Sequence, residues 1–378
     1  MIITKAHLLN FRNHSASAFE FAPAMNVFLG ENGQGKTNIL EALSFLCITK
    51  SFYASADSIV LQRDKNFFEV EGTIEVETGR ESAVRVAYDE RIKQKKIFIN
   101  NGEVEKFSEV IGRFPVVILS PENNSITFGA PAERRKFIDL IISQSNRLYA
   151  EEMIEYKRIL RQRNRILSES DTRLNERELE SWNDMLVTFG ARIIFKRTQF
   201  LREFSPYLMQ MYSQLVSEKE IPKLLYAPSV SLEENIPPDE IEILLRKKLE
   251  KRRADELRLR TTIVGPHRDE CIFSLNGMLL KNYASQGQHK TFLIALKAAE
   301  FFYLKERCEE TPVFLLDDVF SELDEERSKK LLTLVETLGQ TFITTTSENI
   351  FGRSPQWNNE RKKFLIRSGS VISSIKAA

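Results

Sequence analysis

Eight residues near the start of the chain have the types and spacing that bind phosphate. They read Gly-Glu-Asn-Gly-Gln-Gly-Lys-Thr, which matches the pattern G-x-x-x-x-G-K-T in full. Glycines let successive backbone N–H groups curl around one anion, and a following helix adds partial positive charge at its N-terminus. The pattern therefore predicts a loop for a nucleoside triphosphate, made of Gly30, Glu31, Asn32, Gly33, Gln34, Gly35, Lys36 and Thr37.

Each of the last two residues of this loop has a predicted role in the chemistry. Lys36 is expected to reach the β- and γ-phosphates, and the Thr37 hydroxyl is expected to hold Mg²⁺. Two acids far along the chain complete the set, because the apolar run 313–316 ends in Asp317 and Asp318. Asp317 would hold Mg²⁺ with Thr37, and Asp318 would orient or deprotonate the attacking water. Together these residues predict nucleotide hydrolysis.

A third stretch could also contact an anion. Ser285-Gln286-Gly287-Gln288 stands directly before a run with helical spacing, and so offers a hydroxyl and backbone N–H groups at a helix start. Taken alone, this stretch would be an ordinary helix cap. The two acids that follow it in the chain favour the interpretation that it forms the second half of the nucleotide site.

The elements that must position these residues follow from apolar spacing. Residues 26–29 form an apolar run that predicts a buried strand before the loop, and the residues after Thr37 keep helical spacing. Alternating patterns over 68–76, 84–88 and 96–99 predict an antiparallel sheet. Further strands are expected at 2–9, 19–21, 114–119 and 342–346, and a hairpin at 272–280 about Asn276-Gly277. The expected fold class is α/β.

The middle of the chain is predicted to be a separate helical lobe. Helical patterns cover 134–217 and 239–260, with a proline-containing loop at 221–238 between them. We therefore expect a discontinuous head at 1–130 and 261–378 and a helical lobe at 131–260, which is too short in heptads for a long coiled coil. The lobe carries three basic sets, each either a solvated face or a nucleic-acid contact: Arg158, Arg161, Arg163, Arg165; Arg192, Lys196, Arg197, Arg202; and Arg246, Lys247, Lys248, Lys251, Arg252, Arg253, Arg258, Arg260.

Composition limits the class of protein further. The 378 residues are 42% hydrophobic and 28% charged, with a net charge of +1, which neither requires nor forbids an acidic partner. No apolar run is long enough to span a membrane, and no signal-peptide core is evident, so we expect a cytoplasmic protein without a membrane partner. Cys47, Cys271 and Cys308 are scattered and indicate neither a disulfide framework nor a zinc site.

These motifs together resemble the ABC-type ATPases of the branch that maintains and repairs chromosomes, and most closely the RecF family. The resemblance covers essentially the whole chain. It includes the loop at 30–37, the signature at 285–288, the acidic strand end at 313–318 and the D-loop at 321–324. Three further motifs contribute: Leu-Asn-Phe-Arg-Asn-His at 9–14, Gly-Ala-Pro-Ala-Glu-Arg-Arg at 129–135 and Val-Gly-Pro-His-Arg-Asp at 264–269.

The resemblance implies a fold and a mode of action. The fold would be an ABC-type ATPase head with a mixed sheet and an antiparallel β-subdomain, joined to the helical lobe. ATP with Mg²⁺ would close a head-to-tail homodimer, in which Ser285, Gln286, Gly287 and Gln288 of one chain contact the nucleotide of the other. Asp324 and Thr346 would also contact it. The dimer would clamp double-stranded DNA, act with RecO and RecR where duplex meets single-stranded DNA, and help to load the recombinase.

The sequence departs from the family pattern in places. Ser51-Phe52-Tyr53 stands where typical members have Ser-His-Arg, so an arginine from that loop is absent. Gln286 takes a position that is glycine in many ABC proteins. Asp318 replaces the glutamate common in transporters, and a threonine of 344–346 replaces their switch histidine. The last two differences predict slow hydrolysis.

Two other functions remain open from the sequence. The ATPase subunit of a membrane transporter fits the nucleotide motifs, although the sheet and helical lobe between Lys36 and Asp317 argue against it. A DNA-holding scaffold that binds ATP without turnover fits the lobe, although the intact Asp317 and Asp318 argue against that. Membrane cofractionation would support the first function, and kinetics would decide the second.

Overall fold

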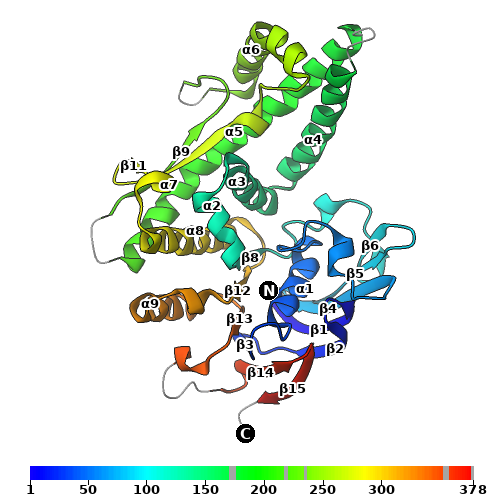
Figure 1. The fold of residues 1–378 in the computed structure, drawn as a ribbon, viewed down its shortest axis with the longest axis vertical. Helices are drawn as coiled ribbons and strands as arrows, with labels where there is room; N and C mark the ends of the chain where they lie inside the picture. The colour runs from blue at the N-terminus through cyan, green and yellow to red at the C-terminus, as the bar shows by residue number, and fades with distance from the viewer. Residues whose placement is uncertain (170–175, 217–219, 234–235, 352–356, 376–378) are drawn as a thin grey trace. The chain divides into compact units, whose positions relative to one another are not determined.

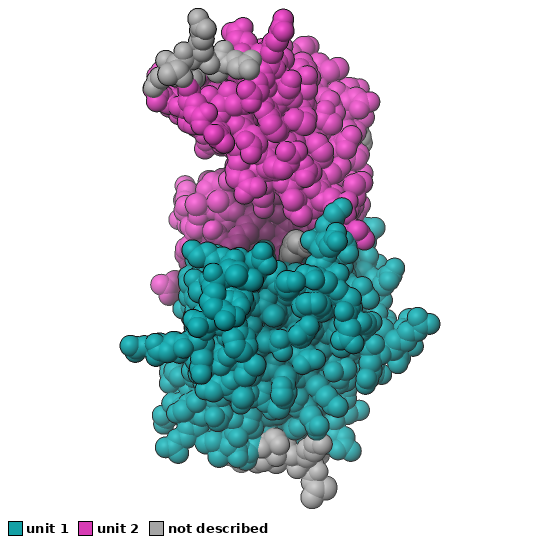
Figure 2. Space-filling view, turned by 90° about the vertical axis from the view of Figure 1, so that its right-hand side faces the viewer, with its two compact units in different colours: residues 1–124, 211–218, 290–378 teal, residues 125–210, 219–289 magenta. Residues whose placement is uncertain are grey.

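The structure of the chain, a computed structural model, contains two compact units (Figures 1 and 2). It describes residues 1–169, 176–216, 220–233, 236–351 and 357–375. The first unit comprises residues 1–124, 211–218 and 290–378, and the second comprises 125–210 and 219–289. Residues 261–289, which the sequence assigned to the head, thus cluster with the helical unit. The reason is a strand at 222–227 that pairs with residues 270–275. The division of the chain into functional domains stays a prediction.

The first unit holds the predicted antiparallel sheet, which is larger than expected. Its order is β2-β1-β4-β5-β6-β7, so the two N-terminal strands belong to it. Buried and exposed residues alternate along β4, as in a sheet with one solvated face. Asn100 and Asn101, with φ of 50° and 66°, form the turn between the last two strands. The strands are β1 (Ile2–Phe11), β2 (His14–Glu20), β4 (Phe67–Glu75), β5 (Glu81–Asp89), β6 (Gln94–Ile99) and β7 (Gly102–Glu103).

A second sheet in the same unit is mixed, with order β15-β14-β3-β13-β12-β8. Five neighbouring strands run parallel and β15 runs antiparallel at the edge, which confirms the predicted mixed sheet. The predicted strands near 27, 114, 313 and 342 are all present, whereas the sequence did not predict β14 and β15. The strands are β3 (Met25–Leu29), β8 (Val116–Leu119), β12 (Val313–Asp317), β13 (Thr341–Thr345), β14 (Arg361–Arg367) and β15 (Ser370–Ile375).

Helix α1 (Lys36–Ile48) lies between the two sheets of this unit. It contacts β1, β4 and β5 on one side and β8, β12 and β13 on the other. Most of its residues are buried, so it lacks the polar stripe of a surface helix. Apolar residues of the helix and both sheets form one continuous core. This packing fixes the start of α1, and with it the loop at 30–37, relative to both sheets. The unit also contains α9 (Glu325–Val335) and most of α8 (Gln286–Arg307).

The second unit is mainly helical, as predicted, and the structure adds two features that the sequence did not show. The helical tract predicted at 134–217 is not continuous, because Asn146 ends one helix and caps the next by accepting a bond from the Tyr149 N–H. The loop predicted at 221–238 contains an edge strand whose first residue is Pro222, the position where a strand tolerates proline. Its helices are α2 (Asn124–Phe128), α3 (Pro131–Ser145), α4 (Arg147–Ser168), α5 (Glu176–Leu215), α6 (Pro238–Leu259) and α7 (Leu280–Tyr283), although residue 124 of α2 and residues 211–215 of α5 cluster with the first unit.

A small sheet and several short turns complete the description. The sheet of the second unit has the order β11-β10-β9, with β9 (Pro222–Ala227), β10 (Glu270–Leu275) and β11 (Met278–Leu279), and its hairpin turn at Asn276-Gly277 is as predicted. Single 3₁₀ turns lie at Asp57–Val60, Phe107–Glu109, Pro121–Asn123, Pro266–Arg268, Val319–Glu322 and Glu348–Phe351. Among the described residues, no helix combines the length and the apolarity needed to cross a membrane.

Candidate functional site

The mixed sheet gathers the predicted site residues of the first unit at one edge. The carboxyl ends of parallel strands lie at the same edge of a sheet, where α/β proteins bind ligands. The loop at 30–37 follows β3, and Asp317 and Asp318 stand at the end of β12. The threonines of 344–346 stand at the end of β13, which lies between those two strands. Residues far apart in the sequence therefore meet at one place.

Glycines shape the loop that follows β3. Gly33 and Gly35 have φ of 79° and 102°, a region that side chains rarely adopt. A Cβ atom on Gly30 would lie 2.5 Å from the backbone oxygen of Ile366, so this position also requires glycine. The two glycines that define the motif, and Gly33 between them, are thus required by the local geometry.

Lys36 turns its ammonium group into the loop. Its Nζ donates to the backbone oxygens of Gly30 and Glu31, each at 2.8 Å. Burial lowers the pKa of Lys36, whereas the carboxylates of Asp318 and Asp317 oppose this shift by favouring the charged form. The ammonium is thus already held where the loop closes around an anion.

The Thr37 hydroxyl and Asp317 lie together as a magnesium site requires. Thr37 Oγ1 donates to Asp317 Oδ1 at 2.8 Å, and Thr344 Oγ1 donates to the same oxygen at 2.8 Å. Burial raises the pKa of Asp317, and the bonds from Thr344 and Thr37 oppose that shift. No cluster of three or more potential metal ligands of the His, Cys, Asp or Glu type occurs among the described residues. Mg²⁺ does not need one, since it binds one or two carboxylates together with phosphate oxygens and water.

Asp318 has an unusual backbone conformation that Thr344 supports. Its φ is 47°, and its N–H donates to Thr344 Oγ1 at 2.8 Å. Thr344 therefore contacts both Asp317 and Asp318. The sequence pointed to the three threonines 344–346 without showing which of them makes these contacts. Thr346, the residue expected to contact nucleotide, is exposed beyond the end of β13, and its role stays a prediction.

The signature residues form the start of helix α8 in the second unit. Ser285 and Gln288 cap each other: the Ser285 N–H donates to Gln288 Oε1 at 2.8 Å, and the Gln288 N–H donates to Ser285 Oγ at 3.2 Å. Gln288 Nε2 also donates to Glu220 Oε1 at 2.7 Å. Ser285 and Gln286 are exposed and Gly287 is half-buried, so this helix start is open to a ligand.

Asp324 of the D-loop has a structural task in this chain. Its carboxylate accepts a bond from the Arg327 N–H at 2.8 Å and so caps helix α9, and it also pairs with the Arg327 guanidinium. These bonds lower the pKa of Asp324. Its predicted contact with nucleotide stays a prediction.

The loop at Ser51-Phe52-Tyr53 contacts the motif at 9–14 through Arg12 and Glu41. Glu41 of α1 accepts a bond from the Ser51 hydroxyl, and it pairs with Arg12, whose Nε lies 2.7 Å from Glu41 Oε2. The Arg12 guanidinium also lies 5.9 Å from the ring centroid of Tyr53, which is 58% exposed. Arg12 thus holds this loop in place.

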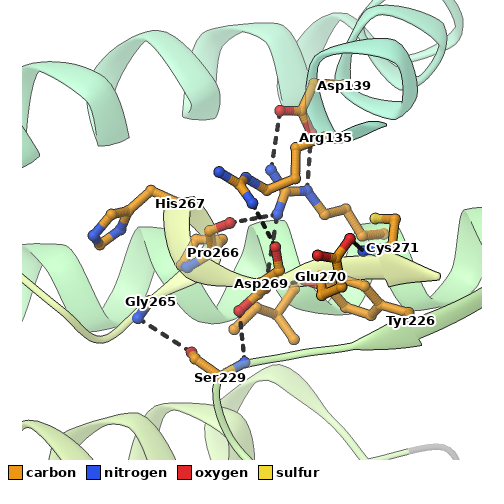
Figure 3. Close-up of polar contacts among 12 residues, drawn as sticks. Arg135, Asp139, Tyr226, Ser229, Gly265, Pro266, His267, Asp269, Glu270 and Cys271 are labelled. Carbon is orange, nitrogen blue, oxygen red and sulfur yellow. Dashed lines mark hydrogen bonds and ion pairs between the residues drawn. The ribbon is translucent and has the colours of Figure 1, made fainter. Parts of the chain in front are cut away.

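The structure also joins the two family motifs of the second unit. Arg135 points toward Asp269 and donates to its backbone oxygen at 2.6 Å (Figure 3). The Asp269 carboxylate accepts bonds from the Tyr226 hydroxyl and from the Ser229 N–H, the latter at 2.6 Å. Beside it, the fully buried Arg197 binds Asp139 through two bonds of 2.9 Å. The motifs at 129–135 and 264–269 therefore share one buried polar network.

His267, two residues before Asp269, is half-buried and bonded through both ring nitrogens. Tyr156 Oη lies 2.7 Å from its Nδ1, and the Thr262 backbone oxygen lies 3.1 Å from its Nε2. Because a carbonyl only accepts, Nε2 carries the hydrogen and Nδ1 accepts from Tyr156. Burial lowers the pKa of His267 to about 4. Both ring nitrogens of His267 therefore have hydrogen-bond partners within the second unit.

Carboxylates neutralise part of each basic set. Arg163 is the clearest case: it is buried and pairs with the buried Glu256 at 2.5 Å, so it cannot face nucleic acid. Arg161, Lys247 and Lys251 are exposed. The predicted nucleic-acid contacts of the three sets therefore stay predictions for such exposed members. Further ion pairs of these sets include Arg158–Glu155, Arg165–Glu169, Arg192–Glu152, Arg197–Asp139, Arg246–Asp184, Arg252–Asp255, Arg253–Glu176 and Arg258–Asp255.

Comparison with known proteins identifies relatives over nearly the whole chain. The family model described as RecF/RecN/SMC N terminal domain matches residues 2–361. The DNA replication and repair protein RecF of Chloroherpeton thalassium is 42% identical over 360 residues, which cover 94% of this chain and 98% of that protein. The protein of the same name from Salinibacter ruber is 39% identical over 383 residues, which cover 99% of this chain and 92% of that protein.

Solved structures agree with these relatives. The recombination mediator protein RecF with ATP, of the RecFOR pathway, has a TM-score of 0.91 at 31% identity, covering 99% of this chain and 97% of that chain. An Smc head bound to the C-winged helix domain of ScpA has a TM-score of 0.55 at 14% identity, covering 100% of this chain and 98% of that chain, and shares the fold alone. The predicted fold, an ABC-type ATPase head with a helical lobe, is therefore confirmed.

Proposed function

Because the chain belongs to the RecF/RecN/SMC N-terminal domain family, and within it to the RecF DNA replication and repair proteins, we propose that it is an ATP-dependent DNA clamp. ATP binds and closes a homodimer on DNA, and slow hydrolysis of that ATP opens it. The observation that carries this proposal is the bond between Thr37 Oγ1 and Asp317 Oδ1, which joins the phosphate loop to the acidic strand end.

The residues of the first unit supply the chemistry of ATP hydrolysis. The loop at 30–37 holds the phosphates, and Lys36 neutralises charge on the β- and γ-phosphates. Thr37 and Asp317 would hold Mg²⁺, which would neutralise charge on the same phosphates when bound. Asp318 orients the attacking water and accepts its proton. A short aspartate side chain in this place, with no histidine on the neighbouring strand, favours a slow reaction.

Dimerisation follows from having one loop and one signature in each chain. The exposed Ser285 and the half-buried Gly287 would contact the γ-phosphate held by the partner subunit, as Gln286 and Gln288 would beside them. Two nucleotides are then buried in a head-to-tail pair. Hydrolysis removes the γ-phosphate charge that the signature binds, so the closed dimer is no longer more stable than the separated subunits.

DNA would be held by cations on the helical unit, such as the exposed Arg161, Lys247 and Lys251. Contacts of lysine and arginine with phosphate give salt-sensitive binding and little reading of sequence. The solved relative is named as part of the RecFOR pathway, so we propose that RecO and RecR are partners at junctions of duplex and single-stranded DNA. Loading of the recombinase there requires a cytoplasmic location.

ATP turnover by purified protein, with and without a short gapped duplex, tests this proposal. Lys36→Arg should keep part of the affinity for ATP and lose hydrolysis by about 100-fold or more, because a planar guanidinium cannot take the place of the compact ammonium in the loop. Lys65→Arg, outside the site, is the control. Unchanged turnover in the Lys36 variant would reject its role, and no turnover in the wild type would favour the non-hydrolysing scaffold.

A further inference from the structure

Two hairpin turns press against the outside of the phosphate loop. The first hairpin contributes Asn13 of the turn between β1 and β2 and His14 at the start of β2, and the turn between β14 and β15 contributes Ser368 and Gly369. The turns also touch each other, because a Cβ atom on Gly369 would lie 2.1 Å from the backbone oxygen of Asn13. None of these residues is among those predicted to bind nucleotide.

The bonds from these turns reach two consecutive carbonyl groups of the loop. The Gln34 backbone oxygen accepts from Asn13 Nδ2 at 3.2 Å and from the Gly369 N–H at 2.9 Å. The next oxygen, that of Gly35, lies 3.1 Å from Nε2 of the fully buried His14. A carbonyl only accepts, so Nε2 of His14 must carry the hydrogen.

The peptide bond converts these outer contacts into an inner geometry. The carbonyl of one residue and the N–H of the next lie in one plane and point in opposite directions. A bond that fixes the Gln34 oxygen therefore also fixes the Gly35 N–H, and a bond that fixes the Gly35 oxygen also fixes the Lys36 N–H. Both N–H groups are turned away from the supporting turns, toward the side where phosphate-binding loops hold the phosphates.

Further contacts hold the supporting residues themselves. Asn13 Oδ1 accepts from Asn38 Nδ2 at 2.8 Å, and the Ser17 hydroxyl lies 3.0 Å from His14 Nδ1. The Gln34 side chain is also fixed, because its Oε1 accepts from the Ser368 N–H at 2.7 Å. The Ser17 hydroxyl in turn donates to the Gly369 backbone oxygen at 3.1 Å. Burial lowers the pKa of His14, and its bonds to the Gly35 and Gly369 backbone oppose that shift.

We propose that Asn13, His14 and the Ser368-Gly369 turn are positioning residues that preset the Gly35 and Lys36 N–H groups for the nucleotide β-phosphate. The proposal rests on the proposed function, since it concerns the ATP site. It adds that the loop owes its anion-binding geometry to two turns outside the motif. A loop that is ordered before binding loses less conformational freedom when phosphate arrives, so its affinity is higher.

Nucleotide affinity of His14 variants tests this inference. His14→Leu removes the donor at similar volume, and we expect roughly tenfold weaker binding of both ATP and ADP, the scale of one lost hydrogen bond. Both nucleotides are affected because both carry the β-phosphate. His14→Gln places an amide donor at similar reach and should bind within about threefold of wild type. Isothermal calorimetry with Mg²⁺ gives these constants, and steady-state kinetics should show the loss in KM rather than in kcat.

A packing control separates positioning from stability. Phe19 lies edge-on to His14, with ring centroids 6.3 Å apart, but makes no bond to the loop. Phe19→Leu should lower the melting temperature and leave both nucleotide affinities unchanged. If it weakened binding as much as His14→Leu does, or if His14→Gln bound as weakly as His14→Leu, the inference would be overturned.

A second variant keeps the test valid if His14→Leu fails to fold. Asn13→Ala should weaken ATP and ADP binding by only about threefold, because the Gln34 oxygen keeps its bond from the Gly369 N–H. Wild-type affinity in both the Asn13 and the His14 variants would overturn this inference but leave the proposed function intact. A wild-type chain that bound neither nucleotide would defeat the proposed function as well.

Discussion

Asp318 combines the carboxylate proposed to activate water with a backbone conformation that few residues tolerate. Its φ of 47° suits aspartate and asparagine, so Asp318→Asn should fold normally. The amide cannot accept a proton from water, and loss of a general base costs about 100-fold or more in rate. We therefore expect the variant to bind ATP, to hydrolyse it at least about 100-fold more slowly, and to accumulate as the ATP-bound dimer.

Light scattering and single-turnover hydrolysis check this prediction together. Asp64→Asn is a matched control, because Asp64 also has a positive φ, of 64°, and lies outside the site. A variant that stayed monomeric with ATP, or that kept wild-type turnover, would show that Asp318 does not activate the water.

The site residues that the sequence predicted each belong to a short motif that can be recognised without the fold. Lys36 and Thr37 follow their glycines directly, so a local pattern is enough to find them. Thr344 and His14 act on residues distant in sequence, and only the folded chain shows those contacts. A signal for His14 did exist in the family motif at 9–14, but the motif alone gives no role to each of its residues.

Strands and helices, like the site residues, were predictable from the sequence where a local pattern marks them. The alternation along β4 and the apolar run of β12 identify strands because burial itself sets those patterns. The sequence did not predict strand β9, because proline and a loop-like composition surround it. Its pairing with β10 is a tertiary contact, which a local pattern does not show. The sequence did not predict the break between α3 and α4, because Asn146 lies between two good helical patterns. Only its capping bond identifies it as a boundary.

Arg197 joins helix α5 to two other elements of the second unit. It binds Asp139 of α3, and its Nη1 donates to the Pro266 backbone oxygen at 2.7 Å. Arg197→Met would leave Asp139 and Asp269 without their buried cation, and removing one partner of a buried pair costs about 3–5 kcal/mol. We expect a loss of that size in the free energy of unfolding.

Urea unfolding measures this loss, and the same helix provides the control. Arg192 pairs with Glu152 at 3.5 Å, but its side chain is 49% exposed. Arg192→Met should therefore cost at most about 1 kcal/mol. Equal losses in the two variants would show that the buried network does not stabilise the unit.

The stability of the second unit should depend on pH through His267. Burial lowers the pKa of His267 from 6.5 to about 4, and the nearby Arg268 and Arg135 contribute to the shift. As the pH falls below 6.5, the unfolded chain binds a proton while the folded chain stays neutral until about pH 4. The contribution of His267 is therefore complete above pH 6.5 and is lost on acidification to pH 4, by roughly 3 kcal/mol at most.

Unfolding measured in urea at several pH values checks this sign. His267→Gln cannot titrate, so the difference in stability between wild type and variant should shrink as the pH falls. The raised pKa of the buried Asp269 acts in the opposite direction, but it is present in both proteins and cancels in this difference. A difference that is constant from pH 4 to pH 7 would contradict the prediction.

The sequence contains one phosphate loop and one signature, so the proposed dimer can be tested through the mass of the protein in solution. If the signature served only the chain that carries it, ATP would leave the mass in solution unchanged. If it serves a second copy, ATP with Mg²⁺ should convert a monomer to a dimer, and a gapped duplex should strengthen the dimer because each subunit adds phosphate contacts. Light scattering with ATP, with ADP and with DNA distinguishes these cases.

Ser285→Arg shows whether the signature makes that contact. The residue is exposed, and its Oγ accepts one bond, from the Gln288 N–H, so its loss costs only about 1 kcal/mol of capping. The long side chain should block the approach of a second subunit, so that the variant binds ATP as a monomer. Ser181→Arg makes the same change on the exposed face of α5 and should still dimerise. Loss of ATP binding with loss of the dimer would indicate misfolding, and a normal ATP-dependent dimer would place the subunit contact elsewhere.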